Sequence, residues 1–277
     1  MSILIVHLVP QGLLFGADRN ITAEIRREDG GIEIRVQGQS QRPKVLKWPN
    51  REAIVGYVGA AEIASMPTDL WLYQRLIGRN LAFPDFDTVA YSLQRELNAC
   101  LASGDLAGPL VVHLGGFEQV GSEWKPVVWF IRNTTGLTNV GTYVLGTGFE
   151  CSEELLKPTY FGSKTGSEIR AEVQRAYFSF RQGYDLAAFN AIEQKLREAI
   201  AGIVHGHPAR LHPVPNTLDE WAKHVKLAVN GYGAYFASFF EPYEQYVGGG
   251  ADVVHAVWPG PEGDGVSWRG EDSRAGP

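Results

Sequence analysis

Cysteine is scarce in this sequence, with Cys100 and Cys151 as its two representatives among 277 residues. Two isolated cysteines form neither a disulfide framework nor the ligand set of a structural zinc site. Neither has a histidine at a suggestive position, which argues against a cysteine nucleophile. Scarce cysteine is typical of a reducing compartment, so we predict a cytoplasmic protein.

Long apolar runs and an excess of basic charge are also absent. No segment approaches the ~20 consecutive apolar residues that cross a bilayer, and the apolar start, residues 3–15, is interrupted by polar residues and a proline. The 25 Lys+Arg residues face 31 Asp+Glu residues, a net charge of −6, which is not the basic footprint of a nucleic-acid-binding protein. We therefore expect no signal peptide, no membrane span and no nucleic-acid partner.

The chain does contain enough apolar residues, 44%, to bury a globular core without covalent or metal staples. Its patterns predict hairpins over 2–17 and 21–36, strands over 53–58, 110–114, 127–131, 142–145 and 251–257, and helices over 67–80, 87–103, 167–182, 186–204 and 218–240. This order predicts an α+β fold in which two antiparallel sheets stack face to face with helices on their outer faces. Residues 259–277 are almost free of apolar residues and are predicted to form a disordered tail.

Two strings near the N-terminus carry the chemical signal. They are GLLFGADRNIT, residues 12–22, and KVLKWPNREAIVGYVGAAE, residues 44–62, which runs into a helical pattern. Together they resemble the proteasome β-subunit family and its bacterial relatives, which are N-terminal-nucleophile hydrolases. The resemblance covers residues 2–80, and weaker matches follow at LGTG, 145–148, and YVGG, 246–249. It implies a four-layer αββα sandwich.

The spacing of the matched residues agrees with this resemblance. Ser2 and Asp18 are 16 positions apart, and Lys44 and Gly59 are 15 apart. A serine hydroxyl needs a base to become a nucleophile, and removal of Met1 is expected to expose the α-amine of Ser2 for that purpose. The resemblance implies that Lys44 stabilises the alkoxide, that Asp18 holds Lys44, and that the Gly59 N–H binds the carbonyl oxyanion.

Several positions depart from the family pattern. Serine stands at position 2 in place of the usual threonine, Thr147 in place of a supporting serine, and Glu244 in place of a supporting aspartate. Val247 stands where a second supporting serine is expected, and it offers no hydroxyl. The segment between Thr147 and Gly248 is longer than in the family. We therefore interpret residues 1–258 as a single proteasome-like domain with an inserted helical region at about 160–215.

The resemblance implies a peptidase that cleaves peptides or unfolded proteins inside a homo-oligomeric ring or stack of rings, with an unfolding ATPase as a partner. Two alternatives stay open. One is a catalytically inactive subunit with a structural or interaction role, and the other is a hydrolase of small amides. Tyr57 and Ala61 flank Gly59 and are expected to line the substrate pocket. We expect no cofactor and no metal, because the histidines at 205, 207 and 212 lie in a Gly/Pro-containing loop without a nearby carboxylate or cysteine.

Overall fold

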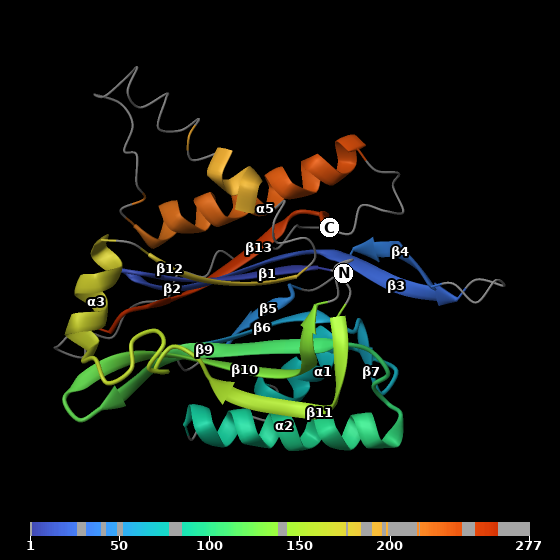
Figure 1. Ribbon diagram of the computed structural model, residues 1–277, viewed down its shortest axis with the longest axis horizontal. Coiled ribbons are helices and arrows are strands. Elements are labelled where there is room, and N and C mark those ends of the chain that lie inside the picture. Colours follow the sequence, from blue (N-terminus) through green and yellow to red (C-terminus); the bar gives the residue numbers. More distant parts are fainter. Residues whose placement is uncertain are drawn as a thin grey trace.

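A computed structural model gives the fold of the chain (Figure 1). It describes residues 2–26, 32–39, 43–48, 52–77, 85–137, 143–175, 177–183, 190–195, 198, 215, 217–239 and 247–259. The predicted tail, apart from residue 259, lies outside these ranges, as does most of the predicted helix at 186–204, of which residues 190–195 and 198 are helical.

The first sheet has the strand order β12-β1-β2-β13. Its centre is the predicted N-terminal hairpin, in which β1 (Ile3–Val9) and β2 (Gly12–Asp18) pair antiparallel around a turn at Pro10. β13 (Ala251–Val257) pairs with β2, and β12 (Phe178–Gly183) pairs with β1, both antiparallel. Residues from the two ends of the chain thus lie side by side in one sheet.

The second sheet has the order β11-β10-β9-β6-β5 and is also antiparallel. Its strands are β5 (Val45–Lys47), β6 (Ala53–Gly59), β9 (Leu110–Val120), β10 (Glu123–Leu137) and β11 (Tyr143–Glu153). Two short hairpins stand beside the sheets, β3 (Asn20–Arg26) with β4 (Ile32–Gln39) and β7 (Glu62–Ile63) with β8 (Met66–Pro67).

The two sheets pack against each other through their inner faces. Side chains such as Leu4 and Phe15 from the first sheet share one apolar cluster with Ile54, Val111 and Val128 from the second. Alternation along β1 sends the neighbouring side chains, including Ile3, to the outer face. The predicted α+β fold with stacked antiparallel sheets is confirmed at this level.

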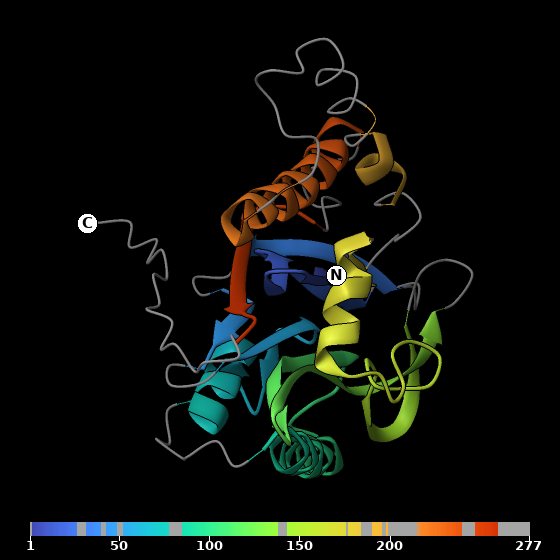
Figure 2. The same cartoon turned by 90° about the vertical axis from the view of Figure 1, so that its left-hand side faces the viewer.

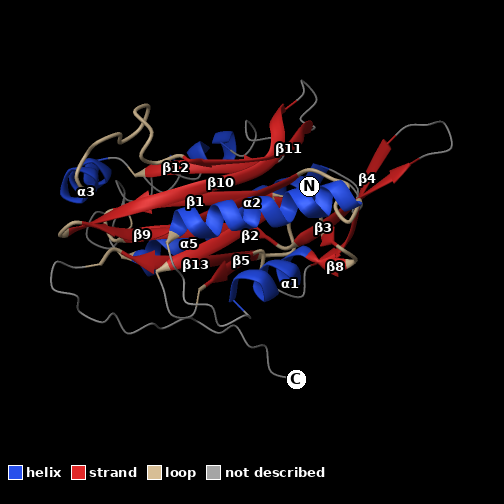
Figure 3. Cartoon of the chain, turned by 90° about the horizontal axis from the view of Figure 1, so that it is seen from below, coloured by secondary structure: helices blue, strands red, loops and turns tan. Residues whose placement is uncertain are grey.

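Helices lie on the outer sides of the sheets. α5 (Leu218–Phe239) packs on the first sheet, and α2 (Phe86–Ser103) and α1 (Thr68–Leu72) pack on the second. Figure 2 shows α5 and α2 at opposite ends of the stack, and Figure 3, seen from the α2 side, shows α2 running along the strands. α2 begins after Asp85, whose side chain accepts a hydrogen bond from the Thr88 N–H, and ends at Gly104 as predicted.

Two sequence-based boundaries need correction. The predicted helix at 167–182 is wrong beyond Arg175, because α3 spans Gly166–Arg175 and the chain then continues as strand β12. Phe178 and Phe180 alternate with polar residues there and pack against the inter-sheet cluster, which is a strand pattern. The predicted helix at 67–80 begins with α1 and continues as the π-helical turn η1 (Tyr73–Ile77), and residues 78–80 lie outside the described ranges.

None of the helices that the structure describes is long and apolar enough to span a membrane.

Candidate active site

The candidate site forms where the first strand begins. Ser2 directly precedes β1, and Asp18 ends the neighbouring strand β2, so antiparallel pairing brings the two residues together. The Ile3 N–H donates to Asp18 Oδ1 at 3.0 Å, which fixes the carboxylate beside Ser2. Ser2 is 6% exposed and Asp18 is fully buried.

Lys44 enters this site from the second sheet. It lies immediately before β5, and its backbone carbonyl accepts a hydrogen bond from the Tyr57 N–H of β6. Its Nζ donates to Ser2 Oγ at 2.6 Å and to the Asn20 carbonyl, and lies 3.4 Å from Asp18 Oδ1. The structure therefore brings together Ser2, Asp18 and Lys44, with the predicted Asp18–Lys44 and Lys44–Ser2 contacts.

The charged groups of Asp18 and Lys44 are both buried away from solvent. Burial raises the pKa of the Asp18 carboxyl, while the Lys44 ammonium and the N–H groups of Ile3 and Gly248 act in the opposite direction. Burial likewise lowers the pKa of Lys44, and the nearby Asp18 carboxylate counters that effect. The ammonium of Lys44 is therefore more easily deprotonated than that of a surface lysine.

This arrangement can activate a hydroxyl group. A lysine nitrogen at hydrogen-bond distance from Ser2 Oγ stabilises the alkoxide that forms when the hydroxyl loses its proton. The carboxylate of Asp18 keeps that nitrogen in place, because both groups are buried and each is the other's counter-charge. The low local dielectric strengthens these interactions relative to water.

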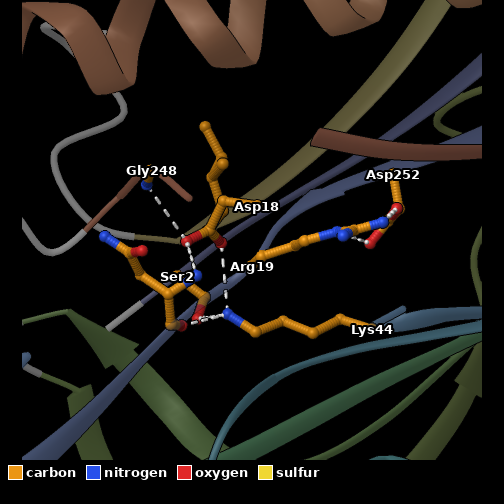
Figure 4. A network of polar contacts seen from close by, with 8 residues as sticks. Ser2, Asp18, Arg19, Lys44, Gly248 and Asp252 are labelled. Carbon is orange, nitrogen blue, oxygen red and sulfur yellow. Dashed lines mark hydrogen bonds and ion pairs between the residues drawn. The ribbon is translucent and has the colours of Figure 1, made fainter. Parts of the chain in front are cut away.

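Part of the site was missed by reasoning from the sequence. Gly248 donates its N–H to Asp18 Oδ2 at 3.4 Å, and Asn20 donates its own N–H to the same oxygen at 3.1 Å. Arg19 points away from Ser2 and forms a bidentate ion pair with Asp252 of β13, with a 2.8 Å bond from Nε (Figure 4). Asp252 is the one acidic residue in strand 251–257, and its place among mostly apolar residues was the signal that could have indicated this pair.

Gly59 ends β6, and the structure explains why a glycine stands there. Its φ is +112°, and a Cβ would lie 2.1 Å from the Pro109 carbonyl oxygen, so a side chain has no room. Tyr57 is 4% exposed, and its ring belongs to the core between the second sheet and its outer helices, which argues against a contact with substrate. Ala61 is half-buried, and its carbonyl accepts a hydrogen bond from the Thr68 N–H.

The remaining predicted supports are not part of this cluster. Thr147 lies on β11, an edge strand, with an exposed side chain, and among the described residues no hydrogen bond joins it to Ser2, Asp18 or Lys44. Glu244 lies outside the described residues. Val247 is fully buried and packs in the apolar cluster beneath α5.

Nothing within the described ranges points to a metal centre. No group of three or more His, Cys, Asp or Glu side chains in the described part of the chain is placed to hold an ion. The histidines at 205, 207 and 212 lie outside that part.

Comparison with known proteins gives weak similarities. No model of a protein family and no curated protein matches the chain. Among solved structures, it is similar to the Anbu (Gly-1) mutant from Hyphomicrobium sp. strain MC1, with 15% identity, a TM-score of 0.45, and coverage of 92% of this chain and 81% of that one. It is also similar to Anbu (ancestral beta-subunit) from Yersinia bercovieri, with 14% identity, a TM-score of 0.38, and coverage of 92% and 80%.

Proposed function

We propose that this chain is a proteasome-like hydrolase that cleaves peptide bonds with the hydroxyl of Ser2 as its nucleophile. One observation carries the proposal, the buried contact of 2.6 Å between Lys44 Nζ and Ser2 Oγ with Asp18 behind it. The fold that goes with this proposal is the four-layer αββα sandwich, supported by α5 and α2 on opposite sides of the two sheets.

The mechanism requires Ser2 to be the first residue of the functional chain. Its free α-amine then takes the proton from Oγ as Oγ bonds to the substrate carbonyl carbon. Lys44 stabilises the alkoxide character of Oγ, and the Gly59 N–H is proposed to donate to the carbonyl oxyanion. The carbon–nitrogen bond breaks as the protonated amine returns its proton to the leaving nitrogen. Water then attacks the ester, releasing a carboxylic acid and restoring the Ser2 hydroxyl.

The cellular setting proposed for this activity is the one implied by the resemblance of residues 2–80 to the proteasome β-subunit family. We propose a cytoplasmic enzyme that assembles into a homo-oligomeric ring or stacked rings and receives unfolded chains from an ATPase. Sedimentation velocity on purified protein measures the assembly state. A monomer at micromolar concentration contradicts the ring and leaves the chemistry of Ser2 to be tested separately.

Substitution of Ser2 by alanine tests the nucleophile. Ser2→Ala removes Oγ and keeps a small residue after Met1, so the fold stays intact while hydrolysis of fluorogenic peptides falls by about 10³-fold or more. A β-lactone probe adds its mass to the wild type and not to Ser2→Ala. Ser238→Ala is the matched control, because it removes an exposed serine hydroxyl on α5 that bonds within its own helix.

Intact mass measurement completes the test. A wild type that has lost Met1, carries one probe molecule and cleaves peptides supports the proposal. If the wild type retains Met1, takes up no probe and cleaves no peptide in a panel, the peptidase is wrong.

An inactive subunit is the second candidate, and Val247 favours it. Its side chain is fully buried among apolar residues, so no hydroxyl is available from this position. If the wild type retains Met1, takes up no probe and cleaves no peptide, a structural or interaction role is the function that remains. If Ser2 takes up the probe but every peptide in the panel is left intact, a hydrolase of small amides is favoured instead.

A further inference from the structure

The segment Val247–Gly250 lies directly against the buried carboxylate of the site. The Gly248 N–H donates to Asp18 Oδ2 at 3.4 Å, and the Gly248 carbonyl accepts from the Arg19 N–H at 3.0 Å and the Asn20 N–H at 3.2 Å. Lys44 approaches the other oxygen, Oδ1 (Figure 4). Gly248 therefore contacts three consecutive residues of the site through its N–H and its carbonyl. The bond to Asp18 is already long, so a small shift of Gly248 breaks it.

The position of Gly248 is set from the side of α5. Val247 is buried in the apolar cluster that includes Tyr232 of α5 and Ile3 of β1. At the next helix position, a Cβ on Gly233 would lie 3.1 Å from Gly248 Cα and 3.4 Å from the Val247 carbonyl oxygen. The backbone of α5 thus rests on the backbone of the segment, and the missing Cβ is what allows this approach.

Glycine at this position is not what the helix itself favours. α5 spans Leu218–Phe239, so position 233 lies inside it, where glycine is less favourable than alanine. The contact with Gly248 gives a reason for a glycine at a position where helix propensity opposes one.

We propose that Gly233 is a positioning residue for Asp18, because its lack of a side chain lets α5 hold Gly248 at the distance where the Gly248 N–H bonds the carboxylate. This inference rests on the proposed function, since it assigns Gly233 a part in presenting Lys44 to Ser2. Gly233 contacts the Val247–Gly248 backbone and acts on the reaction through Gly248 and Asp18.

The proposal predicts a specific change in the pH profile. With the Gly248 donor displaced, the ionised form of Asp18 loses one hydrogen bond, so its pKa rises and the carboxylate protonates at higher pH. Two further charged side chains lie nearby, Arg19 and Asp252, which pair with each other, and Lys44 faces Asp18 directly. The α-amine of Ser2, the base of the proposed mechanism, also titrates on the acid limb of kcat. All of these groups are present in every variant, so a difference in that limb between Gly233→Ala and an unperturbed variant of the same helix reports on the surroundings of Asp18.

The experiment compares Gly233→Ala and Gly233→Val with Asn230→Ala. Asn230 is an exposed residue on the same helix, so its replacement by alanine raises helix propensity without touching the segment. We expect Asn230→Ala to leave kcat, KM and the pH profile unchanged. Gly233→Ala lowers kcat about threefold to tenfold with KM unchanged and moves the acid limb to higher pH, and Gly233→Val does so more strongly.

Hydrogen exchange separates this proposal from the proposed function. Peptides that contain Ile3, Asn20 and Gly248 are expected to exchange at least threefold faster in Gly233→Ala than in Asn230→Ala, whether or not the protein hydrolyses anything. An inactive wild type with this change in exchange contradicts the peptidase alone. Equal exchange and equal pH profiles in the two alanine variants overturn the positioning role of Gly233.

Discussion

Asp18 and Lys44 illustrate at the residue scale how a buried pair constrains both of its members. Asp18 is fully buried and Lys44 is 3% exposed, so both charged groups are desolvated and each supplies the counter-charge of the other. Removing one partner leaves the second as an uncompensated buried group. The pair is therefore costly to break and cheaper to remove entirely.

A double-mutant cycle on this pair gives the first prediction. Lys44→Met is expected to lower the free energy of unfolding by about 3–5 kcal/mol, because it leaves the Asp18 carboxylate without its cation. Asp18→Asn is expected to cost a similar amount, and the double variant clearly less than the sum of the two. Urea unfolding measures the free energy of unfolding of the wild type, the two single variants and the double variant. Additive costs in this cycle contradict the coupling that the 3.4 Å contact indicates.

Local pairing accounts for one part of the candidate site, the meeting of Ser2 and Asp18, and the resemblance to a family supplied the roles of these residues. Ser2 and Asp18 meet since a two-strand hairpin with a short turn allows one register. Prediction of Lys44 as a site residue required the family pattern, since no local feature of the sequence places it against β1. The Gly248 donor and the Arg19–Asp252 pair join positions about 230 residues apart, and no periodicity in the chain reports such a contact.

The end of α2 gives a prediction at the scale of a single element. Gly104 has a φ of +79°, and a Cβ there would meet nothing within 4 Å, so the cost of a side chain is backbone strain alone. Gly104→Ala is expected to lower the free energy of unfolding by about 1 kcal/mol. Arg95→Ala, at an exposed position inside the same helix, is the control and is expected to leave stability almost unchanged. Thermal unfolding compares them, and equal Tm values for the two variants contradict the strain.

Elements were predicted well where one pattern persists and poorly where it changes. α2 has a regular apolar stripe, an acidic residue before its start and a glycine after its end, and its bounds differ from the prediction by one residue. The helix beginning near residue 167 was extended too far, because apolar residues continue after Arg175 with a different period. β1 also requires a neighbour for its backbone hydrogen bonds, and β12 supplies it. That requirement is tertiary and is invisible in a short window.

At the scale of the whole molecule, the order of elements along the sequence predicts stacked sheets with outer helices, but not the detailed structure of each region. Strand-rich segments separated by helices favour stacked sheets with outer helices, and the two sheets and their shared cluster agree with this. Within the region at about 160–215, helices are predicted over 167–182 and 186–204, and β12 corrects the first of them from residue 178 onward. That the region is an insertion into one domain remains a prediction.

The layer between the sheets contains a histidine whose burial makes the stability of the fold depend on pH. His113 of β9 is fully buried and stacks on the ring of Phe130 at 3.9 Å between centroids. Among the described residues, neither of its ring nitrogens has a hydrogen-bond partner. Burial, with a smaller contribution from Arg132, lowers the pKa of His113 to about 3. The folded protein therefore holds this imidazole neutral.

The last prediction follows from that difference in proton binding. The unfolded chain binds a proton at His113 near pH 6.5, whereas the folded chain does not until about pH 3. The contribution of neutral His113 to the free energy of unfolding is therefore fully present above pH 6.5 and is lost as the pH falls toward 3. Between pH 7.5 and 5 this residue alone should cost about 2 kcal/mol of unfolding free energy. His113→Leu removes the titration, so the difference in stability between the variant and the wild type should grow by that amount toward pH 5. Urea unfolding at both values measures it, and a difference that stays constant contradicts the assignment.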